Sequence, residues 1–390
     1  MVRYVLVLSD AHLAPLLSSA QMPYRSAAFA PDAALAQTID RAVARRIREG
    51  GALEIVLAGD VFDFDAPLEN CETTSCVRSV DVRTAPGAAQ ALRRILADHP
   101  SVLFALRRAL AVGARVVILP GNHDAQLVFP EVREVLRGAL RDEPSASLSA
   151  RFASPLVATE VVFRSWSHVT ADGLVVVEHG HQYDPLCTLS RLLPQDGRTE
   201  STVGTVSSFY GPLLFEGGDP FAIDPFAERR SVLRALASSL QRSGPAAILR
   251  CTRELMAASA DCPSPSAWEL LADEMRVGPR SARARHACFA SKATVVDLLK
   301  AASREYDYGP DVEAALQRAM TVATDVHGAK VAVVGHTHAP RQVVLPNGAV
   351  MLNSGSWTPR RSPSDPVGTY AWIATDGQRV LSANVEAVRR

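Results

Sequence analysis

The 390-residue chain lacks any uncharged apolar run of about 18 residues, the length that a membrane-spanning helix requires. It also lacks net charge, because 41 basic residues balance 41 acidic ones, and this argues against a general affinity for nucleic acid or anionic membranes. None of its six cysteines forms a C-x-x-C pair, so reduced thiols are the expected state. The sequence contains neither an internal repeat nor a low-complexity tract.

The overall composition is that of an ordinary globular protein. Apolar residues make up 47% of the chain and charged residues 21%, so a chain of this length can bury a sizeable core. The apolar run near the amino terminus, residues 4–8, is too short for a signal peptide, and no cleavage-site pattern follows it. We therefore expect a cytoplasmic protein.

Five short apolar runs have the pattern of strands that are buried on both faces. With their polar ends they span residues 3–10, 52–60, 114–124, 173–184 and 329–338. Residues 31–48 place apolar side chains four apart, as an amphipathic helix does, and a helical region broken at Pro100 follows the second run. This alternation predicts an α/β fold, in which sites form at the carboxyl ends of the strands.

The end of the chain returns to β-structure after a long stretch of different character. Two β-runs flank Asn347-Gly348, a dipeptide typical of hairpin turns, and a strand pair spans residues 368–386. Between residues 185 and 325, helical periodicity, as at Leu316 and Met320, replaces long strands. We expect residues 185–325 to form a helical insertion that caps the site, on a core of residues 1–184 and 326–390.

Residues able to bind a metal ion stand at the ends of the five predicted strands. They are Asp10, His12, Asp60, Asp63, Asn122, His123, Asp124, His179, His336 and His338. Each allows a simpler reading, since aspartate often caps helices, Asn and Gly favour turns, and a buried histidine can bond a carbonyl oxygen. One shared site would explain all five strand ends at once. Carboxylates, an amide oxygen and imidazoles without a thiolate suit hard to borderline divalent ions.

These residues form five blocks in a fixed order along the chain. The blocks are Asp10-x-His12, Gly59-Asp60-x-x-Asp63, Gly121-Asn122-His123-Asp124, His179 after a strand, and Gly335-His336-x-His338. In this order they resemble the signature of the calcineurin-like metallophosphoesterases, over residues 1–182 and about 326–360. The resemblance implies a four-layer αββα sandwich, here with a large, mainly helical inserted cap, that binds two divalent metal ions and hydrolyses phosphoester bonds.

The resemblance also implies which residues hold the metals. One ion would be held by Asp10, His12, Asp60 and His338. The other would be held by Asp60, Asn122, His179 and His336, so that Asp60 bridges the two. Manganese is the expected metal, with iron, zinc, cobalt and magnesium as alternatives.

Further roles follow from the same resemblance. A hydroxide bridging the two metals would attack the phosphorus, while His123 assists the leaving group or steadies the phosphate. Asp124 would orient the imidazole of His123, and Asp63 would steady a ligand such as His12. His181, which follows the fourth strand, would either contact substrate or support the site.

The substrate stays open at this point. A phosphodiester or pyrophosphate linkage in a small or lipid-linked molecule is expected, with a phosphomonoesterase as an alternative. One relative, the UDP-diacylglucosamine pyrophosphohydrolase, also has helices inserted before its final His-x-His pair, but it carries arginine at the place of His123. Apolar residues within 207–226 could line a lipid-binding lid or pack on the core, and basic residues within 276–292 could bind an anion or lie on the surface. A non-catalytic scaffold and a membrane-surface protein are the remaining alternatives.

Overall fold

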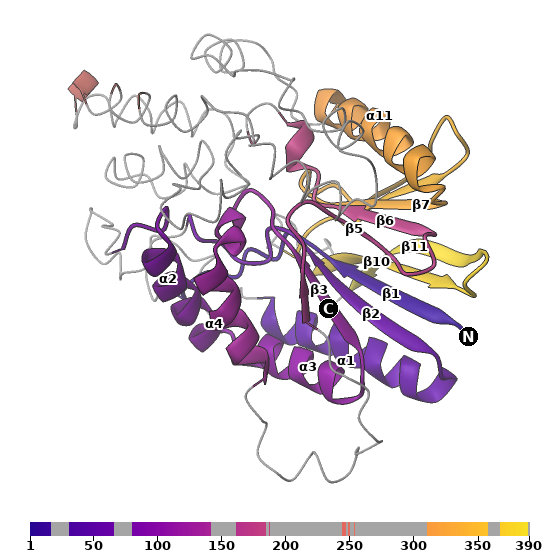
Figure 1. Ribbon diagram of the computed structural model, residues 1–390, viewed down its shortest axis with the longest axis horizontal. Coiled ribbons are helices and arrows are strands. Elements are labelled where there is room, and N and C mark those ends of the chain that lie inside the picture. The colour runs from indigo at the N-terminus through magenta and orange to yellow at the C-terminus, as the bar shows by residue number, and fades with distance from the viewer. Residues whose placement is uncertain are drawn as a thin grey trace.

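A computed structural model of the protein describes residues 1–16, 31–65, 80–141, 161–184, 187, 244–246, 249, 253, 310–357 and 367–388. These residues form a mixed α/β fold built on two mixed β-sheets (Figure 1). The helices are α1 (Asp32–Glu49), α2 (Ala85–Asp98), α3 (Pro100–Ala111), α4 (Pro130–Arg141) and α11 (Pro310–His327).

Each sheet combines parallel and antiparallel strands. The first has the spatial order β11 (Val380–Val388), β10 (Gly368–Thr375), β1 (Arg3–Leu8), β2 (Ala52–Ala58), β3 (Arg115–Leu119) and β4 (Val161–Phe163). The second has the order β5 (Ser167–Val169), β6 (Val175–Glu178), β7 (Val331–Val334), β9 (Val350–Asn353) and β8 (Arg341–Val344). Strands β1 to β4 are mutually parallel, and so are β6, β7 and β9. Each parallel set therefore brings its carboxyl ends to one edge of its sheet.

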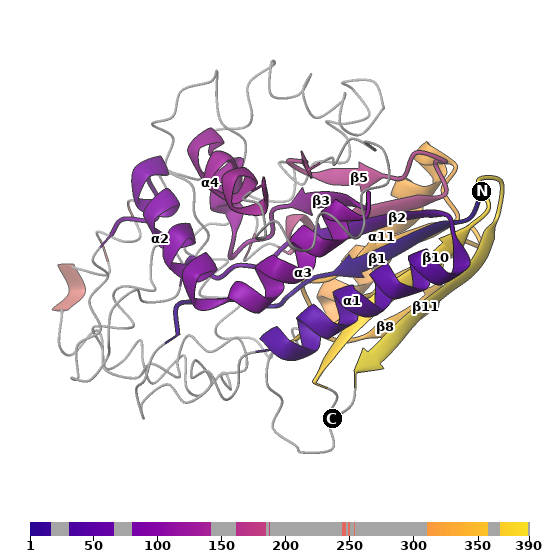
Figure 2. The same ribbon diagram turned by 90° about the horizontal axis from the view of Figure 1, so that it is seen from below.

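Three buried apolar clusters hold the elements together. One joins helices α1 to α4 to the outer face of the first sheet, over which α1 and α3 lie side by side (Figure 2). A second lies between the sheets, where Val5 and Val7 of β1 pack with residues such as Val177 and Val333 of the second sheet. The third joins α11 to the far face of the second sheet (Figure 1). Burial on both faces explains why the strands are continuously apolar.

Most of the predicted elements are confirmed. The five apolar runs contain β1, β2, β3, β6 and β7, the predicted amphipathic helix is α1, and Pro100 separates α2 from α3. Asn347-Gly348 lies in the turn of the antiparallel β8–β9 hairpin, and β10 pairs with β11 as the predicted strand pair.

Within the predicted insertion, residues 185–325, the longest described segment is the carboxyl-terminal part, residues 310–325. Leu316 and Met320 lie in α11, which packs on the second sheet although residues up to 325 were assigned to the insertion. The apolar stretch 207–226 and the basic stretch 276–292 lie outside the described residues. Among the described helices, none combines the length and the hydropathy needed to cross a membrane.

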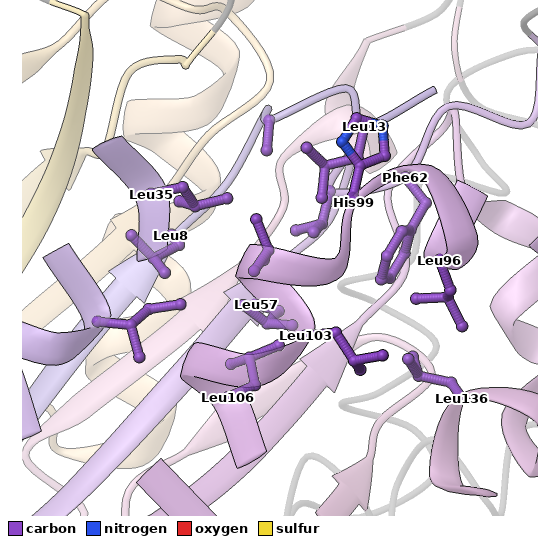
Figure 3. Close-up of a pocket in the computed structure, with 14 residues that line it drawn as sticks. Leu8, Leu13, Leu35, Leu57, Phe62, Leu96, His99, Leu103, Leu106 and Leu136 are labelled. Carbon is purple, nitrogen blue, oxygen red and sulfur yellow. The ribbon is translucent and has the colours of Figure 1, made fainter. Parts of the chain in front are cut away.

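An apolar cavity lies between the first sheet and its helices (Figure 3). Leucine side chains from β1, α1, β2 and α3 line it, and His99 closes one end. The imidazole of His99 is bonded on both sides, to the Asp32 carboxylate at 2.9 Å and to the carbonyl of Ala14 at 2.7 Å. These two contacts tie the loop after β1 to the starts of α1 and α3.

We expect Leu106→Ala in α3 to destabilise the protein by about 2–5 kcal/mol, because Leu106 is buried and its truncation would enlarge this cavity. Urea unfolding followed by circular dichroism would measure the change. Val344→Ala is the matched control, because Val344 on β8 is 70% exposed and its loss should change stability by less than about 0.5 kcal/mol. Equal effects of the two substitutions would contradict the described packing.

Candidate metal centre

Residues at the carboxyl ends of strands from both sheets meet in one place. The N–H of Asp10 donates to the carbonyl of Gly59 at 3.1 Å, and the N–H of His12 donates to the carbonyl of Asp60 at 2.9 Å. From the second sheet, the N–H of His336 donates to the Asp10 carboxylate at 3.1–3.2 Å. Backbone hydrogen bonds thus fix the loops after β1, β2 and β7 against one another.

Asp10, His12 and His338 form one of the four groups of ligand-type side chains found among the described residues. The Nε2 atoms of His12 and His338 lie 3.2 Å apart, and His338 Nε2 lies 3.2 Å from Asp10 Oδ1. One donor atom from each side chain lies within 4.8 Å of the other two, so a single metal ion could contact all three.

Asp60, His179 and His336 form another of these groups, which meets the same distance limit. His179 Nδ1 donates to the carbonyl of Ala58 at 2.8 Å, so the lone pair of the neutral ring is on Nε2. Nε2 lies 3.3 Å from Asp60 Oδ2 and 3.3 Å from Asn122 Oδ1. Three electron-pair donors that converge in this way need a cation or a proton between them.

Asp60 is the residue that links these two groups. Its Oδ2 lies 3.3 Å from His179 Nε2 and 4.0 Å from His12 Nε2, which belong to different groups. Its Oδ1 accepts the backbone N–H of His123 at 2.7 Å, which fixes the rotation of the carboxylate. All seven residues predicted to bind metal therefore lie in or beside two adjoining groups.

The backbone at five of these residues is in the left-handed region. Their φ values are 53° at Asp10, 46° at His12, 51° at Asp60, 69° at His336 and 57° at His338. Within the described part of the chain, no other residue except glycine has a positive φ. Such conformations are unfavourable for residues with a Cβ and cluster at functional sites, where the surrounding structure imposes them.

The electrostatics of the groups favour cation binding. Burial would raise the pKa of Asp60, but the imidazoles of His179, His123 and His12 hold it well below its usual value. Burial lowers the pKa of His12, which keeps that ring neutral and able to act as a ligand. Burial also opposes the charge of His179, yet Asp60 and Asp10 raise its pKa to about 9. A proton on His179 thus takes the place that a cation would take, and metal binding would release it.

Two glycines allow the loops to come this close. A Cβ on Gly59, whose φ is 85°, would lie 2.6 Å from the ring of His179. A Cβ on Gly121 would lie 2.8 Å from the carboxylate carbon of Asp60. The absence of a Cβ at Gly59 and Gly121 is therefore explained by the ligand packed on each of them.

His123 lies beside the two groups. Asp124, which was predicted to orient its ring, has other partners. The carboxylate of Asp124 does not contact the His123 ring; it accepts backbone N–H groups from Gly121, Asp60, Val61 and Phe62. Asp124 therefore ties the loop after β2 to the loop after β3, and burial together with the Asp60 charge raises its pKa to about 7.

The His123 ring instead faces Asp63 and Asp65. Its Nδ1 lies 3.6 Å from Asp63 Oδ1 and 3.4 Å from Asp65 Oδ2. Burial opposes the charge of His123, but Asp60, Asp63 and Asp65 raise its pKa to about 10. Asp63 also faces His12 Nδ1, at 3.9 Å, as expected for a residue that steadies this ligand.

Further residues support the site; His181 was expected to contact substrate or support it, whereas Asp184 and Asn353 were given no role from the sequence. Asp184 Oδ2 lies 3.0 Å from His336 Nε2, and His181 is buried with its ring 5.3 Å from that of His179. The amide of Asn353 donates to the carbonyl of Gly335 at 3.0 Å.

The segment that contains Asn353 also supports Asp10. The hydroxyl of Ser9 donates to the Asp10 carboxylate and lies 2.7 Å from the hydroxyl of Ser354. The hydroxyl of Ser356 donates to the Asp10 carbonyl at 3.2 Å. The signal that could have revealed these residues is position alone, because Ser9, Asn353 and Ser354 stand at or just beyond strand ends that meet the site.

No protein-family model matches the chain, and no curated protein matches it. Inferences about function therefore rest on the geometry and chemistry of the site. The donor atoms are carboxylate oxygens, imidazole nitrogens and an amide oxygen, and the side chains could hold metal ions.

We expect Gly121→Ala to lower the affinity for a divalent ion such as Mn²⁺ by at least about tenfold, because the added Cβ displaces Asp60 from both groups. Isothermal titration of the metal-free protein would measure the change. Gly138→Ala is the matched control, because a Cβ there meets nothing within 4 Å on helix α4. Equal affinities in both variants would show that Asp60 is not a shared ligand.

Proposed function

We propose that the protein is a dinuclear metal-dependent phosphoesterase. The observation that carries the proposal is the position of Asp60, whose Oδ2 lies between imidazoles of two separate ligand groups. One carboxylate that reaches two groups of donors supports a pair of ions that share a ligand. One ion would be held by Asp10, His12, Asp60 and His338, and the other by Asp60, Asn122, His179 and His336.

Paired divalent ions suit the hydrolysis of phosphoesters. Bound ions of this kind lower the pKa of water, clamp phosphoryl oxygens and neutralise the charge that develops as the ester bond breaks. The chain supplies anionic and neutral ligands in both groups and buries most of them, so that water does not screen these charges. Manganese is the metal we propose, with iron, zinc, cobalt or magnesium as alternatives.

His123 is suited to assist the leaving group. Its side chain is 16% exposed, unlike the fully buried ring of His179, and its Nδ1 faces two carboxylates. These charges favour the protonated ring, which could give its Nε2 proton to the departing oxygen or steady the phosphate. Asp124 would act on the backbone of the site and not on this ring.

The fold is consistent with the same proposal. Apolar cores between α1–α4 and the first sheet, between the sheets, and between the second sheet and α11 support a four-layer αββα arrangement. We propose a phosphodiester or pyrophosphate linkage of a small or lipid-linked substrate, and a cytoplasmic location. Which of these linkages the enzyme prefers would be read from its activity on monoesters, diesters and nucleotide sugars.

The first test joins metal content to activity. Purified protein reconstituted with Mn²⁺ should bind two ions per chain and hydrolyse bis-p-nitrophenyl phosphate. Asp60→Asn should abolish this activity and lower bound metal towards one ion or none, because the substitution weakens the shared ligand. Elemental analysis and release of p-nitrophenolate measure the two quantities. A variant that keeps two ions and near-normal turnover would refute the shared-ligand site, and metal without hydrolysis in the wild type would favour a non-catalytic role.

The second test separates chemistry from metal binding. His123→Ala should keep the metal content of the wild type, because the ring is not proposed as a ligand. Its turnover should fall by about 10²-fold or more on an alkyl phosphodiester, whose leaving group needs a proton. The loss should be much smaller on a p-nitrophenyl diester, whose leaving group departs as the anion. Equal losses on the two substrates would remove the acid role from His123.

A further inference from the structure

Asp63 serves two histidines with one carboxylate. Its Oδ2 lies 3.9 Å from His12 Nδ1, and its Oδ1 lies 3.6 Å from His123 Nδ1. Oδ1 also accepts the backbone N–H of Asp65 at 3.0 Å. The rings of His12 and His123 meet edge to face at 71°, with centroids 4.8 Å apart. Asp63 is therefore divided between a proposed ligand and the proposed acid, and it cannot by itself define the orientation of both rings.

Asp65 is the second carboxylate beside His123, and it stands two residues after the Gly59-Asp60-x-x-Asp63 block. Its Oδ2 lies 3.4 Å from His123 Nδ1, slightly nearer than Asp63 Oδ1 at 3.6 Å. Asp65 is 2% exposed, and a carboxylate removed from water is costly unless a cationic or hydrogen-bonding partner stabilises it. Contacts of this length are common before substrate binds and tighten in the reactive complex.

A backbone hydrogen bond links the loops that carry Asp65 and His123. The N–H of Phe64, which precedes Asp65, donates to the carbonyl of His123 at 3.0 Å. This hydrogen bond links the loop after β2 to the loop after β3, next to Asp65 on one side and at His123 on the other. Asp65 therefore lies beside the Nδ1 edge of the ring.

We infer that Asp65 is a positioning residue that fixes the His123 ring with Nε2 directed at the leaving oxygen. The inference rests on the proposed function, because it assigns Asp65 to a step in phosphoester hydrolysis. Asp63 is then shared between the ligand His12 and His123, while Asp65 adds a second carboxylate beside the group that transfers the proton. A site with a separate carboxylate for its acid is suited to esters of poor leaving groups.

The experiment compares Asp65→Ala and Asp65→Asn in the metal-loaded enzyme, across phosphodiesters whose leaving groups range from p-nitrophenolate to an alkoxide. Asp65→Ala should lower kcat/KM on the alkyl ester by about tenfold or more, and on the p-nitrophenyl ester by less than about twofold. Asp65→Asn should recover part of the loss on the alkyl ester, because its amide oxygen can accept a hydrogen bond from Nδ1 in the reactive complex. Metal content should be unchanged in both variants.

Asp32→Ala is the matched control, because it removes a carboxylate bonded to an imidazole, that of His99, outside the site. It should lower stability without changing the ratio of activities on the two esters. If Asp65→Ala instead lowers activity equally on all esters, Asp65 has only a structural role and the inference fails.

A measurement on the metal-free protein separates this inference from the proposed function. In nitrogen-15 NMR of the histidine side chains, the Nδ1 resonance assigned to His123 by its loss in His123→Gln should shift in Asp65→Ala. It should not shift in Asp32→Ala. A wild type without hydrolysis but with this shift would refute the proposed function and leave the contact in place. An unchanged resonance would refute the positioning role whatever the activity.

Discussion

A buried carboxylate must be surrounded by groups that stabilise its charge, and at Asp60 this requirement organises the site. Asp60 is 1% exposed, and its partners come from three separate loops: a backbone N–H from His123, the ring of His12, and the ring of His179 in the other sheet. No one loop could supply this environment. The two sheets must therefore pack closely before the ligand groups exist, and the apolar cluster between them holds the strand ends in place.

The same packing supports an unfavourable backbone. Asp10 and Asp60 adopt positive φ directly after buried strands, and His336 does so after β7. Each such residue costs of order 1–3 kcal/mol, which only a well-packed surrounding can maintain. The backbone hydrogen bonds of Asp10 and His12 to the loop after β2, and the hydroxyl groups of Ser9 and Ser356, are the interactions that hold these turns. The packing of the cores thus maintains the strained turns that bring the ligand side chains together at the strand ends.

The identity of the ligand residues could be predicted from sequence because parallel strands present their carboxyl ends at a common edge. The continuous apolar run of β1 fixes where Asp10 stands, whatever the path of the loop beyond it. The opposite holds for His123. Whether its Nδ1 faces Asp63, Asp65 or Asp124 depends on the direction of two loops, and Asp124 turns back to bind the N–H groups of the loop after β2.

The limits on the fold prediction have a similar origin. Strands β4 and β5 have three residues each, too few for any periodicity to be read. Val5 and Leu6 are equally apolar and face different cores, so the sequence of β1 shows that both faces are covered but not what covers them. The paired sheets came only from the resemblance to a family, and most of α11 was assigned to the insertion instead of to an outer layer.

The buried carboxylates of the site have different partners, and bound protons balance part of their negative charge. Asp60 reaches both ligand groups, Asp63 is shared between two rings, Asp65 faces His123, and Asp184 lies 3.0 Å from His336. Without cations, such a concentration of buried charge would oppose folding. The raised pKa values of His179 and Asp124 show how the charge is balanced, since protons are retained where the negative charge is densest. Metal ions would displace protons from ligands such as His179, so the polypeptide can form the site first and exchange one kind of cation for another afterwards.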